Sequence, residues 1–204
     1  MPHLIDFDGL EHDLFVLQHT VYGSREFCEN FDLNTACYGG DYEWWEYRGL
    51  LKTYVSNKII ESAIKLRMVQ DFAKYDDEEL DLKDFDRKAR KGLSIGSISG
   101  ASTPLSLRES CNKIVHATEA RMQWINSQNK PEVEYWGGIY ELFGENRGAG
   151  WQVDLNVPDW CTAMIRFNKT IQVEVDWLTS MICKLKNRQH IGRLSAALRL
   201  QTCA

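Results

Sequence analysis

Hydrophobic side chains recur every three to four residues along the first third of the chain. In the first such stretch they are Leu10, Leu14, Leu17 and Val21. This spacing puts them on one face of a helix, so we expect a helix over about residues 10–22 that ends at Gly23. A longer stretch runs from Trp44 to Phe72 without a proline, and Asp41 precedes it as a candidate N-cap. It predicts a long helix that forms the spine of a helical bundle.

A third helical stripe follows a stretch of glycine and serine at residues 92–103. That stretch predicts a flexible connector, and it matches neither a phosphate-binding loop nor a nucleophile elbow. The next helix starts either with Pro104 at its first position or later, with Ser106 and Glu109 as a capping box. At 100° per residue, its apolar stripe consists of Leu107, Cys111, Ile114, Val115, Met122 and Ile125.

The pattern changes after Pro131. Two runs rich in aromatic and β-branched residues flank the turn sequence Glu-Asn-Arg-Gly-Ala-Gly, and they predict a β-hairpin over about residues 133–156. Pro158 then opens another predicted helix. Residues 170–177 alternate like a strand yet lie between helical patterns, so both structures stay open there. Residues 178–200 predict a basic helix.

These elements predict a single domain over residues 1–204 of the mainly α class. We expect a helical bundle over about residues 1–128, an inserted β-hairpin over about 133–156, and a C-terminal helical segment over about 158–204. A chain of 204 residues is long enough to bury a normal hydrophobic core.

Charge and cysteine usage narrow the classes of function. The chain has 24 Lys and Arg against 29 Asp and Glu, a net charge of −5, which argues against broad sequence-independent binding to nucleic acid. Basic clusters at residues 87–91 and 184–199 are typical of solvated helix faces. The six cysteines have no zinc-binding spacing, so we expect no metal and no cofactor. Scattered free cysteines, an acidic N-terminus unlike a signal peptide, and no long apolar run predict a cytoplasmic protein without a membrane partner.

One short polar constellation has the residue types of a chemical site. Arg108, Asn112 and His116 follow one another at intervals of four residues, which stacks their side chains on one helix face. A guanidinium, an amide and an imidazole together can bind a phosphate and move a proton. The alternative is structural: His116 caps a carbonyl or packs beside Trp124, Asn112 holds a loop, and Arg108 forms a surface ion pair.

The sequence Leu-Arg-Glu-Ser-Cys-Asn-Lys-Ile-Val-His-Ala at residues 107–117 resembles the motif helix of the HEPN superfamily (higher eukaryotes and prokaryotes nucleotide-binding domains). The motif of that superfamily is an Arg, usually followed by a polar residue such as Asn, with a His at the end of the run. Asn112 and His116 fall on the Asn and His positions. Cys111 stands where the Arg is expected, and we hypothesise that Arg108, one turn earlier, replaces it.

The resemblance implies a helical bundle that forms a homodimer. In active members of the superfamily it implies RNA cleavage without a metal, by attack of the ribose 2′-hydroxyl on the adjacent phosphate. His116 would be the acid and base, Asn112 would orient it or the phosphate, and Arg108 would stabilise the developing charge. Such proteins act in toxin–antitoxin, phage-defence and RNA-processing systems, so an antitoxin-like protein is an implied partner.

Two hypotheses about function follow from different classes. The first is a metal-independent ribonuclease. The second is a catalytically inactive HEPN-like module that binds RNA, a nucleotide or a protein partner. The retained Asn112 and His116 favour the first, whereas Cys111 and the acidic net charge favour the second. A third interpretation is that the motif is coincidental and the protein is a helical interaction domain.

Overall fold

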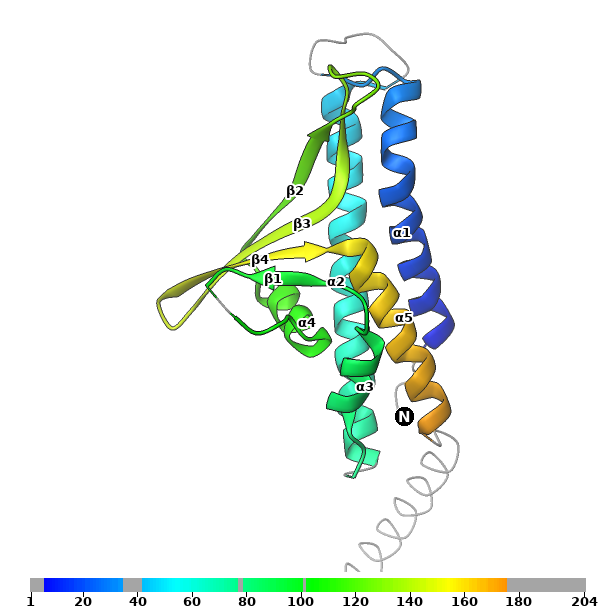
Figure 1. Ribbon diagram of the computed structural model, residues 1–204, viewed down its shortest axis with the longest axis vertical. Coiled ribbons are helices and arrows are strands. Elements are labelled where there is room, and N and C mark those ends of the chain that lie inside the picture. Colours follow the sequence, from blue (N-terminus) through cyan, green and yellow to red (C-terminus); the bar gives the residue numbers. More distant parts are fainter. Residues whose placement is uncertain (1–5, 35–41, 77–78, 101, 176–204) are drawn as a thin grey trace, which may run out of the picture.

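The computed structural model describes residues 6–34, 42–76, 79–100 and 102–175 (Figure 1). Within these ranges the chain forms five helices and a four-stranded antiparallel sheet. The helices are α1 (Phe7–Asn30), α2 (Trp44–Asp76), α3 (Leu82–Ala89), α4 (Leu107–His116) and α5 (Val157–Glu174). The strands are β1 (Gly96–Ile98), β2 (Glu119–Asn126), β3 (Glu134–Asn146) and β4 (Ala149–Asn156).

The long helices α1, α2 and α5 lie side by side, and the sheet projects from one side of them (Figure 1). The mixed α/β architecture corrects the prediction of a mainly α bundle with one inserted hairpin. In particular, the predicted bundle over residues 1–128 contains two strands, β1 and β2. No described helix is long and apolar enough to cross a membrane.

Helix α1 confirms the first predicted apolar stripe, but the helix does not end where it was predicted to end. Leu10, Leu14 and Leu17 are completely buried, and Asp6 caps the helix by accepting a hydrogen bond from the Gly9 backbone N–H at 2.8 Å. The helix continues past Gly23 to Asn30. A single exposed glycine weakens a helix by only about 1 kcal/mol relative to alanine, and the buried side chains beyond it hold the helix together.

Helix α2 confirms the long helical prediction. Its buried positions follow the expected period and include Leu51, Val55, Ile59, Ala63, Leu66 and Val69. Asp41, the predicted N-cap, lies outside the described residues. The first two helices are joined by charge as well as by the core, because Asp13 forms ion pairs with Lys58 at 3.0 Å and Lys65 at 3.2 Å.

Helix α4 starts at the later of the two predicted positions and ends earlier than its apolar stripe suggested. The Ser106 hydroxyl accepts a hydrogen bond from the Glu109 backbone N–H at 3.1 Å. The helix stops at His116, and Met122 lies on β2, which pairs with β3. The Thr118 N–H donates to the Phe143 carbonyl at 2.9 Å and starts this pairing. The helical interpretation of residues 117–125 was therefore wrong, because long-range strand pairing overrides a local apolar period.

The predicted β-hairpin is confirmed as β3 and β4, and the strand order of the sheet is β1-β4-β3-β2. Its inner face buries Tyr140, Leu142, Val153 and Leu155. The predicted flexible connector instead contributes the short edge strand β1, in which Gly96 has a φ of +145° and a Cβ atom would collide with the Asp154 carbonyl. Only glycine fits this close approach of two backbones.

The end of the chain is described in part. The helix predicted from Pro158 is confirmed as α5, which starts one residue earlier and includes residues 170–174, so the open segment is helical there. Residues 176 and 177 and the predicted basic helix at 178–200 lie outside the described residues.

Candidate functional site

A cleft of about 560 Å³ lies between α2, α4 and the turn end of the β3–β4 hairpin. Its walls combine basic, acidic, amide and aromatic side chains. They are Arg67, Glu109, Asn112, Lys113, His116, Glu145, Asn146 and Trp151. Two of the three residues singled out in the sequence, Asn112 and His116, therefore share one cleft.

Buried hydrogen bonds hold α4 against the rest of the molecule. The Asp86 carboxylate accepts a hydrogen bond from the Leu107 N–H at 2.7 Å, at the first residue of the helix. One turn later, the buried Ser110 hydroxyl accepts a hydrogen bond from the indole N–H of Trp160 in α5 at 2.9 Å. Because these contacts fix one face of the helix, the neighbouring face with Asn112 and His116 is left to line the cleft.

Neither Asn112 nor His116 is tied to another side chain. Asn112 is half-buried and His116 is exposed, and in the described part of the chain neither side chain has a hydrogen-bond partner. The structural roles considered for these two residues are not formed, since His116 caps no described carbonyl and the Trp124 ring instead contacts Trp44 and Tyr47. Their polar groups are available to a ligand.

Arg108 does not join them. Its guanidinium forms the surface ion pair considered from the sequence, with Asp71 at 2.8 Å, and a hydrogen bond to the Gln70 side-chain oxygen at 3.3 Å. It lines a separate cavity with residues of α2 and α3. The hypothesis that Arg108 supplies the missing guanidinium of the motif is therefore not supported by its position.

Arg67 of α2 supplies a guanidinium to the cleft instead. Its side chain is half-buried, and its Nε atom is buried without a hydrogen-bond partner. Among the described residues, no carboxylate forms an ion pair with it. Arg108 and, to a smaller extent, Arg67 lie close enough to Cys111 for their positive charges to oppose the rise in the pKa of that thiol. Of these two arginines, Arg67 is the one that lines the cleft with Asn112 and His116.

Cys111 itself lies in the hydrophobic core and does not line the cleft. Its side chain is completely buried, with Leu107 and Ile114 in the same core cluster. Burial raises the pKa of Cys111 to about 12, so the thiol stays protonated at neutral pH. The Cys111 side chain therefore does not contact a ligand bound in the cleft.

Lys113 and Trp151 form the other basic and aromatic part of the cleft. The Lys113 ammonium lies 4.3 Å from the centre of the Trp151 ring and 3.7 Å from the Glu109 carboxylate. The ring lies across β3 at Gly144, where a Cβ atom would collide with it. Because Gly144 has no side chain, the Trp151 indole can lie against β3 and form one wall of the cleft.

Six cleft residues were not predicted as site residues: Arg67, Glu109, Lys113, Glu145, Asn146 and Trp151. Glu109 and Lys113 lie inside the motif, so their spacing from Asn112 and His116 was a usable signal. The others come from α2 and the hairpin, and only the packing of these elements brings them to α4. Among the described residues, no group of three His, Cys, Asp or Glu side chains is placed to hold a metal ion.

No protein-family model matches the sequence, and no curated protein or solved structure is found to be similar to the chain. The function must therefore be inferred from the chemistry of the cleft.

Proposed function

We propose that this protein binds RNA through a phosphate group held in the cleft between α4 and the hairpin. The observation that carries the proposal is Arg67, a half-buried guanidinium with no ion-pair partner among the described residues. Partial burial removes water from a charged group, and that cost is normally offset by a counter-charge. A phosphate offers oxygens that match the planar donor fork of arginine.

The neighbouring side chains fit the same ligand. The Asn112 amide can donate a hydrogen bond to a phosphate oxygen, and Lys113 adds a second positive charge. The cleft also holds the carboxylates of Glu109 and Glu145. Glu109 balances the charge of Lys113 in part, and among the described residues neither carboxylate forms an ion pair with Arg67. A local contact of this kind is compatible with the overall charge of −5.

We propose RNA as the ligand, and not another phosphate compound, because of the residues at the end of α4. Asn112 and His116 stand at the positions of the HEPN-like motif, and they line the same cleft as Arg67. The homodimer and the antitoxin-like partner implied by that resemblance stay predictions.

Cleavage of the bound RNA is the second candidate function, favoured by the presence of both His116 and Glu145 in the cleft. In this reaction one of the two groups accepts the proton of the ribose 2′-hydroxyl, whose oxygen forms a bond to phosphorus. The bond from phosphorus to the 5′-oxygen breaks, and the other group gives that oxygen a proton. The products are a 2′,3′-cyclic phosphate and a free 5′-hydroxyl. Binding stands first because no described side chain orients His116.

Binding is tested with fluorescently labelled single-stranded RNA carrying 2′-O-methyl groups, which lacks the 2′-hydroxyl and so cannot be cut by this route. Fluorescence anisotropy compares the wild type with Arg67→Gln. Loss of a charged hydrogen-bond donor should weaken binding by about tenfold to a hundredfold. The matched control is Arg87→Gln, because Arg87 is an exposed arginine of α3 that pairs with Asp84. Equal affinities of both variants and the wild type would refute the proposal, provided thermal melting shows that Arg67→Gln is folded.

Cleavage is tested with unmodified RNA in the presence of EDTA, side by side with His116→Ala. His116 is exposed and has no described partner, so this variant should fold like the wild type. Cutting by the wild type alone would assign cleavage to His116. Intact RNA in both reactions, together with Arg67-dependent binding, would leave the protein as a binding module.

A further inference from the structure

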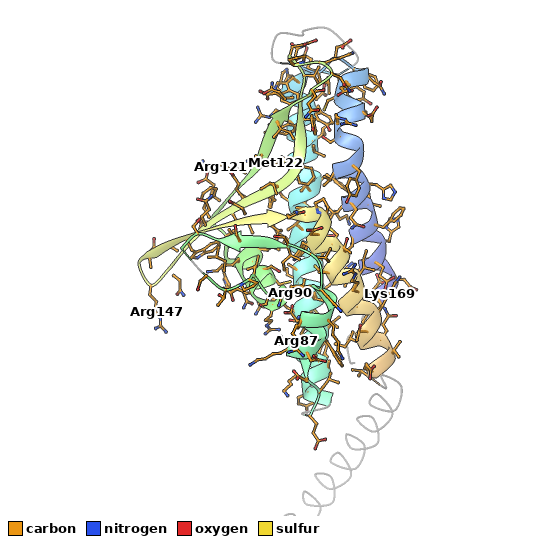
Figure 2. All side chains as sticks on the ribbon, in the orientation of Figure 1. Arg87, Arg90, Arg121, Met122, Arg147 and Lys169 are labelled. Carbon is orange, nitrogen blue, oxygen red and sulfur yellow. The ribbon has the colours of Figure 1, made fainter. Side chains whose placement is uncertain are left out.

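A second basic groove lies between the N-terminal part of α2 and strand β2. It has a volume of about 300 Å³ and is lined by Arg48, Gly49, Lys52, Arg121, Met122 and Trp124. Figure 2 shows Arg121 and Met122 on β2, at the edge of the sheet. Three of its six lining residues are cations, and none is a carboxylate.

Arg48 is held in place by aromatic rings instead of by a counter-ion. Its guanidinium carbon lies 4.8 Å from the centre of the Trp124 ring and 5.3 Å from that of Trp44. The two indoles contact each other edge to face at 4.8 Å, and Trp44 is only 5% exposed. A guanidinium on such a fixed aromatic support keeps its N–H donors free while its orientation is restricted.

Two of the cations in the groove have no carboxylate partner among the described residues. In the described ranges, neither Arg48 nor Lys52 forms an ion pair with a carboxylate. Arg121 is paired with Glu119 at 2.7 Å, on β2 itself. Lys52 follows Arg48 by one helical turn, and Gly49 between them presents no side chain, so the groove stays open to a ligand.

The groove and the cleft both lie along α2. Arg67 in the cleft follows Lys52 in the groove by fifteen positions of this helix, which corresponds to about 22 Å at a rise of about 1.5 Å per residue. At about 3.4 Å per nucleotide, a single RNA strand of about eight nucleotides spans this distance, with one phosphate in the cleft and another in the groove.

We propose that Arg48 and Lys52 form a second phosphate subsite, and that the ligand of this protein is a single-stranded RNA long enough to reach it from the cleft. This inference rests on the proposed function, because it takes the cleft as the first phosphate site. It gives the protein a minimum ligand length: a dinucleotide contacts the cleft alone, whereas an octanucleotide contacts both sites.

The experiment measures the affinity of 2′-O-methyl dinucleotide and octanucleotide probes for the full chain. Three variants are compared with the wild type: Arg48→Gln with Lys52→Gln, Arg67→Gln alone, and the control Arg87→Gln with Lys88→Gln. The control removes the same two charges from an exposed part of α3. The groove variant should bind the octanucleotide at least tenfold more weakly and should bind the dinucleotide like the wild type. The slope of log affinity against log salt concentration for the octanucleotide should fall by about two, one for each cation removed.

The possible failures are distinguishable. If Arg67→Gln weakens both probes but the groove variant and the control weaken neither, the second subsite is refuted and the proposed function stands. If the groove variant alone weakens octanucleotide binding while Arg67→Gln has no effect, the cleft proposal is refuted and so is the path between the two sites. If the groove variant does not fold, Lys52→Gln alone replaces it, since Lys52 is exposed; an octanucleotide affinity equal to that of the wild type would then refute the subsite.

Discussion

Replacing Cys111 with arginine gives the sharpest test of how the motif helix is placed. If the chain used the motif in the ordinary way, Cys111→Arg would restore the expected guanidinium and strengthen RNA binding or cleavage. The structure predicts the opposite result. Cys111 is completely buried in the core, and the positive charges of Arg108 and Arg67 already act on it.

The expected loss of stability has two parts. Forcing a larger side chain into a packed core costs about 1–3 kcal/mol. Burying an unpaired charge costs several kcal/mol more, here increased by repulsion from Arg108 and Arg67. The sum exceeds about 4 kcal/mol, which for a domain of this size lowers Tm by about 10 °C or more. Since domains are stable by only about 5–15 kcal/mol, the variant should be close to unfolding at physiological temperature.

Thermal melting followed by circular dichroism measures this effect. Cys111→Ala is the matched control, because it removes the thiol without adding volume or charge and should cost about 1 kcal/mol. A Cys111→Arg variant that melts with the wild type and binds RNA more tightly would refute the reasoning. It would mean that position 111 faces the cleft and that α4 is rotated from the orientation described here.

Two further predictions concern stability. Gly23 lies inside α1, and a Cβ atom there meets no other atom within 4 Å. Gly23→Ala should therefore raise the free energy of unfolding, measured by urea denaturation, by about 0.5–1 kcal/mol. A loss of stability would show that the helix does not continue through Gly23. Burial raises the pKa of Asp13, but hydrogen bonds and charges from Lys58 and Lys65 outweigh this and hold it below 3.8. Because the folded-state pKa is the lower one, the stabilisation is complete above the unfolded-state pKa and is lost as the pH falls through the folded-state value. Asp13→Asn should therefore be about 1–2 kcal/mol less stable than the wild type near pH 7. The difference should begin to shrink below about pH 4 and close as the pH falls through the lowered folded-state pKa. A difference independent of pH would contradict the assignment of the ion pairs.

The sequence by itself determined the elements whose patterns are local and long. The apolar period of α2 extends over many turns, so the helix could be predicted without knowing which elements pack against it. Ser106 and Glu109 carried the capping signal at the start of α4, and the glycine-rich turn carried the signal of the β3–β4 hairpin. For the site, the spacing of Asn112 and His116 was enough to place both on one accessible helix face.

Tertiary structure decided the rest, because its causes are distant in the chain. Residues 119–126 become a strand through hydrogen bonds to β3, which no local period reveals. Arg108 and Arg67 could not be told apart as partners of Asn112 and His116, since helix spacing says nothing about which residues of α2 lie opposite α4. Packing pairs Arg108 with Asp71 and leaves Arg67 in the cleft without a described counter-ion. The composition of a cleft between elements is set by how their faces pack, and that information appears only when the chain is folded.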